Sequence, residues 1–101
     1  MRTVTITALR RTCYPDLSEQ YELPMDAPCD VRIGSVWRVT EPVRPDGFCE
    51  SAWETLEPFV RRLLNGEGHF YGDWMKNPYS ALLSCNDGFR PVSFYLEMTE
   101  E

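Results

Sequence analysis

Apolar and polar residues alternate near both ends of the chain. In residues 3–9, Val4, Ile6 and Ala8 alternate with threonines, and residues 90–98 repeat this pattern with apolar residues at the even positions from 92 to 96. Successive side chains of a strand point to opposite faces of a sheet. Each segment therefore predicts a strand with one buried and one solvent-facing side, as is typical of antiparallel sheets.

Two further segments are predicted to be strands. Residues 35–40 are rich in β-branched and aromatic residues and end before Pro42. Residues 79–85 and 90–98 flank an Asn-Asp-Gly sequence at 86–88. Asn and Asp bond readily to nearby backbone and Gly accepts a positive φ, so this sequence predicts the turn of a hairpin.

A helical repeat of apolar residues predicts one main helix over residues 50–65. The repeat consists of Trp53, Leu56, Val60, Leu63 and Leu64. Ser51 followed by Glu54 fits a capping box at the start of this helix. Pro58 lacks a backbone N–H, so we expect it to kink or split the helix.

The order of these segments predicts an α+β fold, with about four strands in a mostly antiparallel sheet and the main helix packed on one face. A short helix or loop is expected at 14–23, and a long loop rich in glycine and aromatic residues at 66–78. With 101 residues and 43% hydrophobic residues, the chain is expected to form a single domain over residues 1–101. One helix covers only one face of a sheet, so a homodimer would cover the other.

The chain is acidic, with a formal net charge of −6 and an isoelectric point of about 4.7. A negative protein repels phosphate groups, so we expect neither nucleic acid nor membrane as a partner. No apolar run reaches the roughly 20 residues of a membrane-spanning helix, and the N-terminus lacks a signal core. We therefore expect a cytoplasmic protein whose cysteines are thiols or metal ligands.

Four cysteines are distributed along the chain, at Cys13, Cys29, Cys49 and Cys85. None belongs to a C-x-x-C pair. All except Cys13 could join His69 or Asp87 in a tetrahedral metal site assembled from distant segments. The same thiols could instead be small buried hydrophobic residues, or redox or nucleophilic groups.

Cys49 is the strongest candidate for a reactive thiol. It directly precedes the predicted helix, whose positive dipole end stabilises a negative charge such as a thiolate. The alternative is that Cys49 packs against Trp53. His69 is the only histidine, and it could activate a cysteine with Asp73 as its orienting group, or it could be a surface residue.

The loop and the hairpin supply the other candidate ligand-binding groups. Arg90 could clamp a carboxylate or phosphate, or it could pair with Asp87 beside the turn. In the 66–78 loop, Phe70, Tyr71 and Trp74 could form a ligand wall, an interface anchor or a lid over the core.

These segments resemble a family of short prokaryotic proteins of about this length with no established activity. The resemblance rests on the opening strand, Asp16-Leu17 with Tyr21, Cys29 before Gly34, Pro45-Asp46-Gly47-Phe48-Cys49 with Ala52-Trp53, Tyr71-Gly72-Asp73-Trp74, and Cys85-Asn86-Asp87-Gly88 with Arg90-Pro91-Val92. It implies that Cys29, Cys49 and Cys85 belong to the family pattern and that Cys13 is peculiar to this chain. Where related chains tend to have Gly after the loop proline, this chain has Tyr79, which alters the entry to the last hairpin. The resemblance implies no activity.

Three functions fit the sequence. The first is a binding module for a small anionic or metal ligand, built from the 66–78 loop and the Cys85–Arg90 hairpin. The second is a thiol-dependent enzyme or redox protein using Cys49 or Cys85. The third is an interaction protein with inert cysteines. The candidate ligand-binding residues are Cys49, His69, Tyr71, Trp74, Cys85, Asp87 and Arg90.

Overall fold

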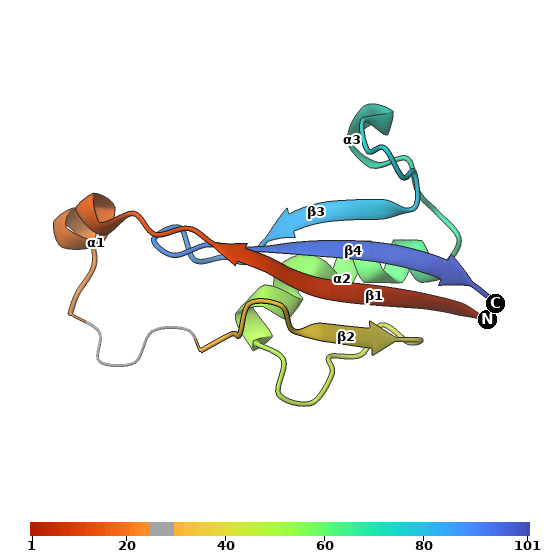
Figure 1. Ribbon diagram of the computed structural model, residues 1–101, viewed down its shortest axis with the longest axis horizontal. Helices are drawn as coiled ribbons and strands as arrows, with labels where there is room; N and C mark the ends of the chain where they lie inside the picture. The colour runs from red at the N-terminus through yellow and green to blue at the C-terminus, as the bar shows by residue number, and fades with distance from the viewer. Residues whose placement is uncertain (25–29) are drawn as a thin grey trace.

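The computed structural model describes residues 1–24 and 30–101, and it confirms the predicted α+β fold. Its elements are β1 (Arg2–Arg11), α1 (Pro15–Tyr21), β2 (Val36–Val39), α2 (Glu50–Leu64), α3 (Phe70–Asp73), β3 (Ser80–Ser84) and β4 (Val92–Glu100). The strands form one antiparallel sheet in the order β2-β1-β4-β3 (Figure 1). The two terminal segments of the chain therefore lie side by side at the centre of the sheet.

The alternating pattern of β1 and β4 determines which face of the sheet is buried. Ile6 lies opposite Leu96 and Ala8 opposite Phe94, and all four side chains are at most 1% exposed. One-residue slippage of either strand would move this apolar set to the solvent, so the pattern fixes the register.

Helix α2 covers this apolar face (Figure 1). Its inward side chains Leu56, Val60 and Leu63 are fully buried, as the helical repeat predicted. Each such side chain stabilises the fold by about 1.5–3 kcal/mol relative to an exposed one. At one end of the helix, Phe48 makes edge-to-face ring contacts with Trp37 and Trp53, at centroid distances of 4.7 and 5.9 Å.

The structure corrects the predicted capping box of α2 and one of the two effects expected of Pro58. The N-cap residue is Cys49, and no side chain caps the helix, so Ser51 and Glu54 do not form a capping box. Pro58 does not split the helix, which is continuous from Glu50 to Leu64. An interior proline costs about 3 kcal/mol, and burial of the apolar residues on either side of Pro58 offsets this cost.

The opposite face of the sheet carries mainly polar side chains. Thr7 and Tyr95 form one cross-strand pair on it, and Thr5 and Glu97 form the next. A polar face is compatible with solvent in an antiparallel sheet. The exposed apolar residue on this face of β3 is Leu82, which is 51% exposed.

The predicted short helix and long loop lie at opposite ends of the molecule (Figure 1). Helix α1 begins with Pro15, projects beyond the end of β1 and has no buried residue. The 66–78 loop contains the single turn α3, in which Tyr71 and Gly72 have left-handed backbone conformations. None of the helices in the described chain is both long and apolar enough to cross a membrane.

Candidate functional site

A cavity of about 160 Å³ lies between the start of α2 and the β3–β4 hairpin. We call it the cysteine pocket. Its described lining residues are Val31, Cys49, Ser51, Ala52, Cys85, Asp87, Val92 and Phe94. Two thiols that are 36 residues apart in the sequence thus border one cavity, and most of the surrounding side chains are apolar.

Cys49 is positioned by the turn that leads into α2. Gly47 takes a positive φ of 78°, and the N–H of Phe48 donates to the carbonyl of Pro45 at 3.1 Å. The buried ring of Phe48 anchors this turn in the core. Cys49 therefore lies directly before the helix, half-buried and free, with its carbonyl accepting from the N–H of Trp53 at 2.9 Å.

Cys85 directly follows β3, and both its backbone and its sulfur contact the backbone of Val92. The N–H of Cys85 donates to the carbonyl of Val92 at 3.1 Å, and the N–H of Val92 lies 3.3 Å from the Cys85 sulfur. The amide of Asn86 donates to the carbonyl of Ser51 at 2.9 Å and also contacts the hydroxyl of Thr55. These bonds fasten the hairpin to α2, so both walls of the pocket are fixed relative to each other.

Asp87 stabilises the hairpin turn, as the sequence predicted. Its Oδ1 accepts from the backbone N–H groups of Phe89 and Arg90, at 2.8 and 3.1 Å. This is the local bonding that makes Asp common in turns.

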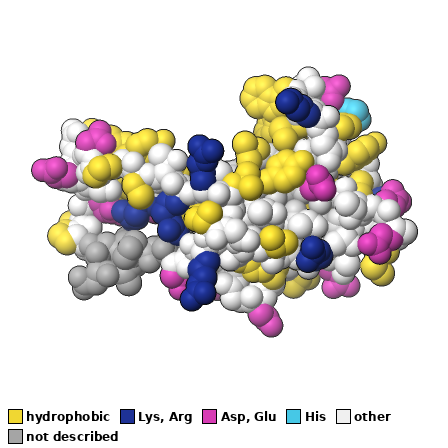
Figure 2. Space-filling view, in the orientation of Figure 1, with side chains coloured by type: hydrophobic (Ala, Val, Ile, Leu, Met, Phe, Trp, Pro, Cys, Tyr) yellow, Lys and Arg dark blue, Asp and Glu magenta, His cyan; other side chains and the backbone are white. Residues whose placement is uncertain are grey.

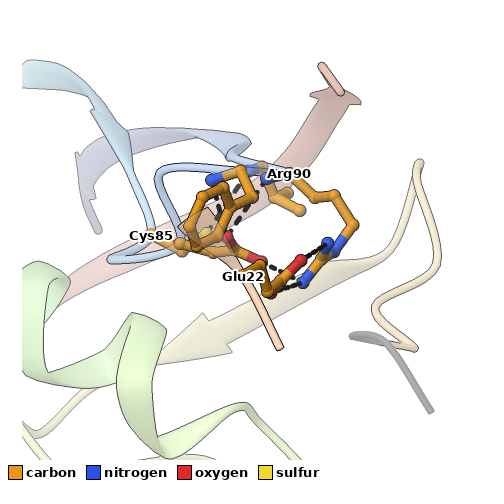
Figure 3. A network of polar contacts seen from close by, with 6 residues as sticks. Glu22, Cys85 and Arg90 are labelled. Atoms are coloured by element: carbon orange, nitrogen blue, oxygen red, sulfur yellow. Dashed lines mark hydrogen bonds and ion pairs between the residues drawn. The ribbon is translucent and has the colours of Figure 1, made fainter. Parts of the chain in front are cut away.

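Arg90 forms a bidentate ion pair with Glu22, at 2.8 Å for each bond (Figure 3). Its guanidinium also lies 3.5 Å from the Asp87 carboxylate. The hydrogen bonds from Arg90 hold the pKa of Glu22 below its usual range, and those to Glu22 raise the pKa of Arg90. The pair ties the end of α1 to the hairpin, so Arg90 is engaged within the protein.

The 66–78 residues lie at the other end of β3, away from the described lining of the cysteine pocket. His69 Nδ1 lies 2.7 Å from the Asp73 carboxylate, and the backbone N–H of His69 donates to the carbonyl of Pro78. Tyr71 packs between Phe59 and Trp74, and burial raises the pKa of Tyr71. The structure thus places Cys49, Cys85 and Asp87 at one site and His69, Tyr71 and Trp74 at another.

Among residues 1–24 and 30–101, no three His, Cys, Asp or Glu side chains are grouped as metal ligands. His69 is separated from Cys49 and Cys85 by the length of β3, so those three do not form the predicted set. Cys29 lies outside the described residues. Cys13 is exposed and free.

Glu22 and Val31 were missed by sequence reasoning. Glu22 pairs with a residue 68 positions away, and such a pairing leaves no local mark in the sequence. Val31 belongs to no periodic segment of the sequence and follows prolines at positions 24 and 28.

Comparison of the chain with protein-family models, with curated proteins and with solved structures finds no match. The family resemblance of the sequence therefore stays a prediction.

Proposed function

We propose that this protein is a small binding module whose ligand enters the cysteine pocket. The observation that supports this is the cavity of about 160 Å³ bordered by two free thiols. An apolar cavity of about 150 Å³ accommodates a ligand the size of benzene. The apolar walls would hold such a ligand, and the thiols would contact it through soft, polarisable sulfur.

The charges around the pocket favour a neutral ligand over the anion that the sequence suggested. Asp87 contributes a carboxylate to the lining, and the guanidinium of Arg90 is paired with Glu22. An anion would meet the Asp87 carboxylate without a free arginine to offset the repulsion. A cytoplasmic location belongs to the same proposal, because a reducing compartment keeps such thiols free.

Benzene is a suitable probe for this site. We expect saturating benzene to raise the melting temperature of the wild-type protein and to shift the methyl resonances of Val31 and Val92. Ser51 is exposed and lines the pocket, so Ser51→Phe should block the entrance and abolish both effects. Glu54→Phe, an equally exposed position on the same helix outside the described lining, is the matched control and should respond like wild type.

Unchanged methyl resonances in the wild-type protein with saturating benzene would refute the pocket as a site for small apolar ligands. A response that survives in Ser51→Phe would place the ligand elsewhere.

A thiol-dependent activity is the second candidate, and the position of Cys49 at the N-terminus of a 15-residue helix favours it. Alkylation by iodoacetamide, which forms a thioether and releases iodide, measures the reactivity of this thiol directly. Cys49 should react faster than the more exposed Cys13 at neutral pH. Slower reaction at Cys49 than at Cys13 would count against nucleophilic use.

A further inference from the structure

Strand β3 leaves one of its long edges open. The carbonyl of Tyr79 accepts from Met98 and the N–H of Cys85 donates to Val92, so the odd-numbered residues of this segment bond to β4. In an antiparallel strand the intervening residues direct their N–H and C=O groups to the other side. For Leu82 and Ser84, no hydrogen-bond partner of these groups occurs among the described residues.

Within residues 80–84 this open edge carries neither of two features that usually prevent strand pairing, a charged residue or a proline. Residues 80–84 read Ser-Ala-Leu-Leu-Ser, with no charge and no proline, and their register with β4 is regular. The opposite edge strand, β2, is only four residues long, contains Arg38 and is soon followed by Pro42. Charges, prolines and short length protect an edge from another strand, and β2, which carries the charge of Arg38 within the strand, is better protected than β3.

An apolar surface adjoins the open edge. Tyr71, Trp74, Met75 and Leu82 line a shallow hollow of about 380 Å³, and the side chain of Trp74 is 73% exposed. We call Tyr71, Trp74 and Met75 the aromatic arm. Helix α3, which carries Tyr71, projects past β3 (Figure 1), and apolar side chains gather there and over β3 in Figure 2. Exposed Trp and Tyr clusters of this kind mark interaction surfaces.

We propose that the open edge of β3 pairs with β3 of a second copy of this chain, which joins the two sheets into one. The five-residue sequence of β3 is nearly symmetric and therefore self-complementary. A twofold axis at Leu82, the centre of this sequence, would place Leu82 opposite Leu82 of the second copy and Ser84 opposite its Ser80. This register satisfies the open N–H and C=O groups of both residues in both copies, as an isologous interface requires.

The charges beside the strand also fit a second copy. In an antiparallel pair, the start of one β3 lies beside the end of the other. The start carries exposed Lys76, the only lysine of the chain, and the end carries Asp87. Self-pairing about Leu82 therefore brings Lys76 of each copy near the end that carries Asp87, whose carboxylate also lies 3.5 Å from Arg90, although the chain as a whole is acidic.

Light scattering after size exclusion tests the proposal on the full chain. Wild-type protein should show twice the chain mass of 11.8 kDa at about 0.1 mM, where even small interfaces associate. Leu82→Lys should raise the dissociation constant about tenfold or more, because it places a charge at the joined edge. Val36→Lys is the matched control, since Val36 is 46% exposed on the other edge strand, and it should remain dimeric.

Hydrogen exchange separates strand pairing from other modes of association. The amides of Leu82 and Ser84 should exchange more slowly as the protein concentration rises. Leu82→Pro removes the outward N–H and keeps the bonds to β4, so it should yield a folded monomer with wild-type circular dichroism. A wild-type monomer at about 0.1 mM, or a dimer that both variants leave intact, would overturn the proposal. If the wild-type protein is a monomer and its Leu82 amide becomes protected only when an unrelated extended peptide is added, the edge binds a foreign strand instead.

Discussion

The two ends of β3 differ in how completely their side chains are enclosed. At the end of the strand, Cys85 borders a pocket whose walls are bonded to α2 and to β4. At its start, the aromatic arm stands on the surface with Trp74 73% exposed. One short strand thus connects a closed site suited to a small ligand with an open site suited to another protein chain.

The difference follows from where α2 begins and ends. The start of α2 lies under the hairpin, so the pocket rests on the buried ring of Phe94. Beyond the last turn of α2 the chain must return to β3 through the 66–78 loop. Of its aromatic residues, Phe70 is buried and contacts Phe59, whereas Tyr71 packs on Phe59 and Trp74 on Tyr71. Enclosure requires helix and hairpin together, and only the pocket end has both.

Phe94→Ala should have the largest effect, because it removes the floor of the pocket. Phe94 is fully buried and packs against Phe48 and Trp37. Truncation of a buried Phe costs about 3–5 kcal/mol of unfolding free energy. Urea denaturation measures this cost, and a loss below about 1 kcal/mol would show that the pocket end is far less tightly packed than the structure indicates.

Gly68→Ala tests whether the arm is fixed on β3. An added Cβ at Gly68 would lie 2.5 Å from the carbonyl oxygen of Pro78, which accepts from His69. We expect a loss of about 1–3 kcal/mol, as for other overpacked positions, together with chemical-shift changes confined to the arm.

Gly88→Ala is the matched control, since its Cβ would meet no atom within 4 Å. Its stability should change by less than about 1 kcal/mol. Equal losses for the two variants would mean that the close contact at Gly68 does not hold the arm.

Acid should release α1 from the pocket end before the sheet unfolds. Hydrogen bonds from Arg90 lower the folded-state pKa of Glu22, below its unfolded value of about 4.3. The stabilisation by this pair is therefore complete above about pH 4.3 and is lost as the pH falls through the lower folded value. An NMR titration of the α1 amides measures the release.

Glu22→Gln should loosen α1 at neutral pH, with the sheet unchanged. Glu57→Gln breaks the more exposed pair with Arg61 on α2 and should have little effect, as surface pairs usually do. An α1 that stays docked in Glu22→Gln would show that the Arg90 pair does not hold it.

Trp74→Ala should have the smallest effect on the isolated chain. Its side chain is mostly exposed, so the unfolding free energy should change by no more than about 0.5 kcal/mol. The same variant should weaken the proposed pairing of two copies, which light scattering measures. A large loss of stability in dilute solution would mean that the arm is part of the core, and the contrast between the two ends would disappear.

The sequence by itself determined the four strands, the main helix and the buried face of the sheet. Strict alternation at Val4, Ile6 and Ala8 and the apolar repeat of α2 are local patterns, and local periodicity decides which side chains point together. The turn at 86–88 was equally local. The continuity of α2 through Pro58 was not a local property. Burial of Leu56 and Val60 on either side of the proline offsets the hydrogen bond that Pro58 cannot form.

Only the tertiary structure decided which candidate residues share a site. Cys49 and Cys85 border one cavity because α2 packs under the hairpin, and His69 lies outside it because β3 separates the loop from that end. Glu22 binds Arg90 across 68 residues, and Leu82 lies on an open edge because β3 is last in the order β2-β1-β4-β3. Strand order and long-range pairing depend on the packing of the whole chain, and no local pattern records them.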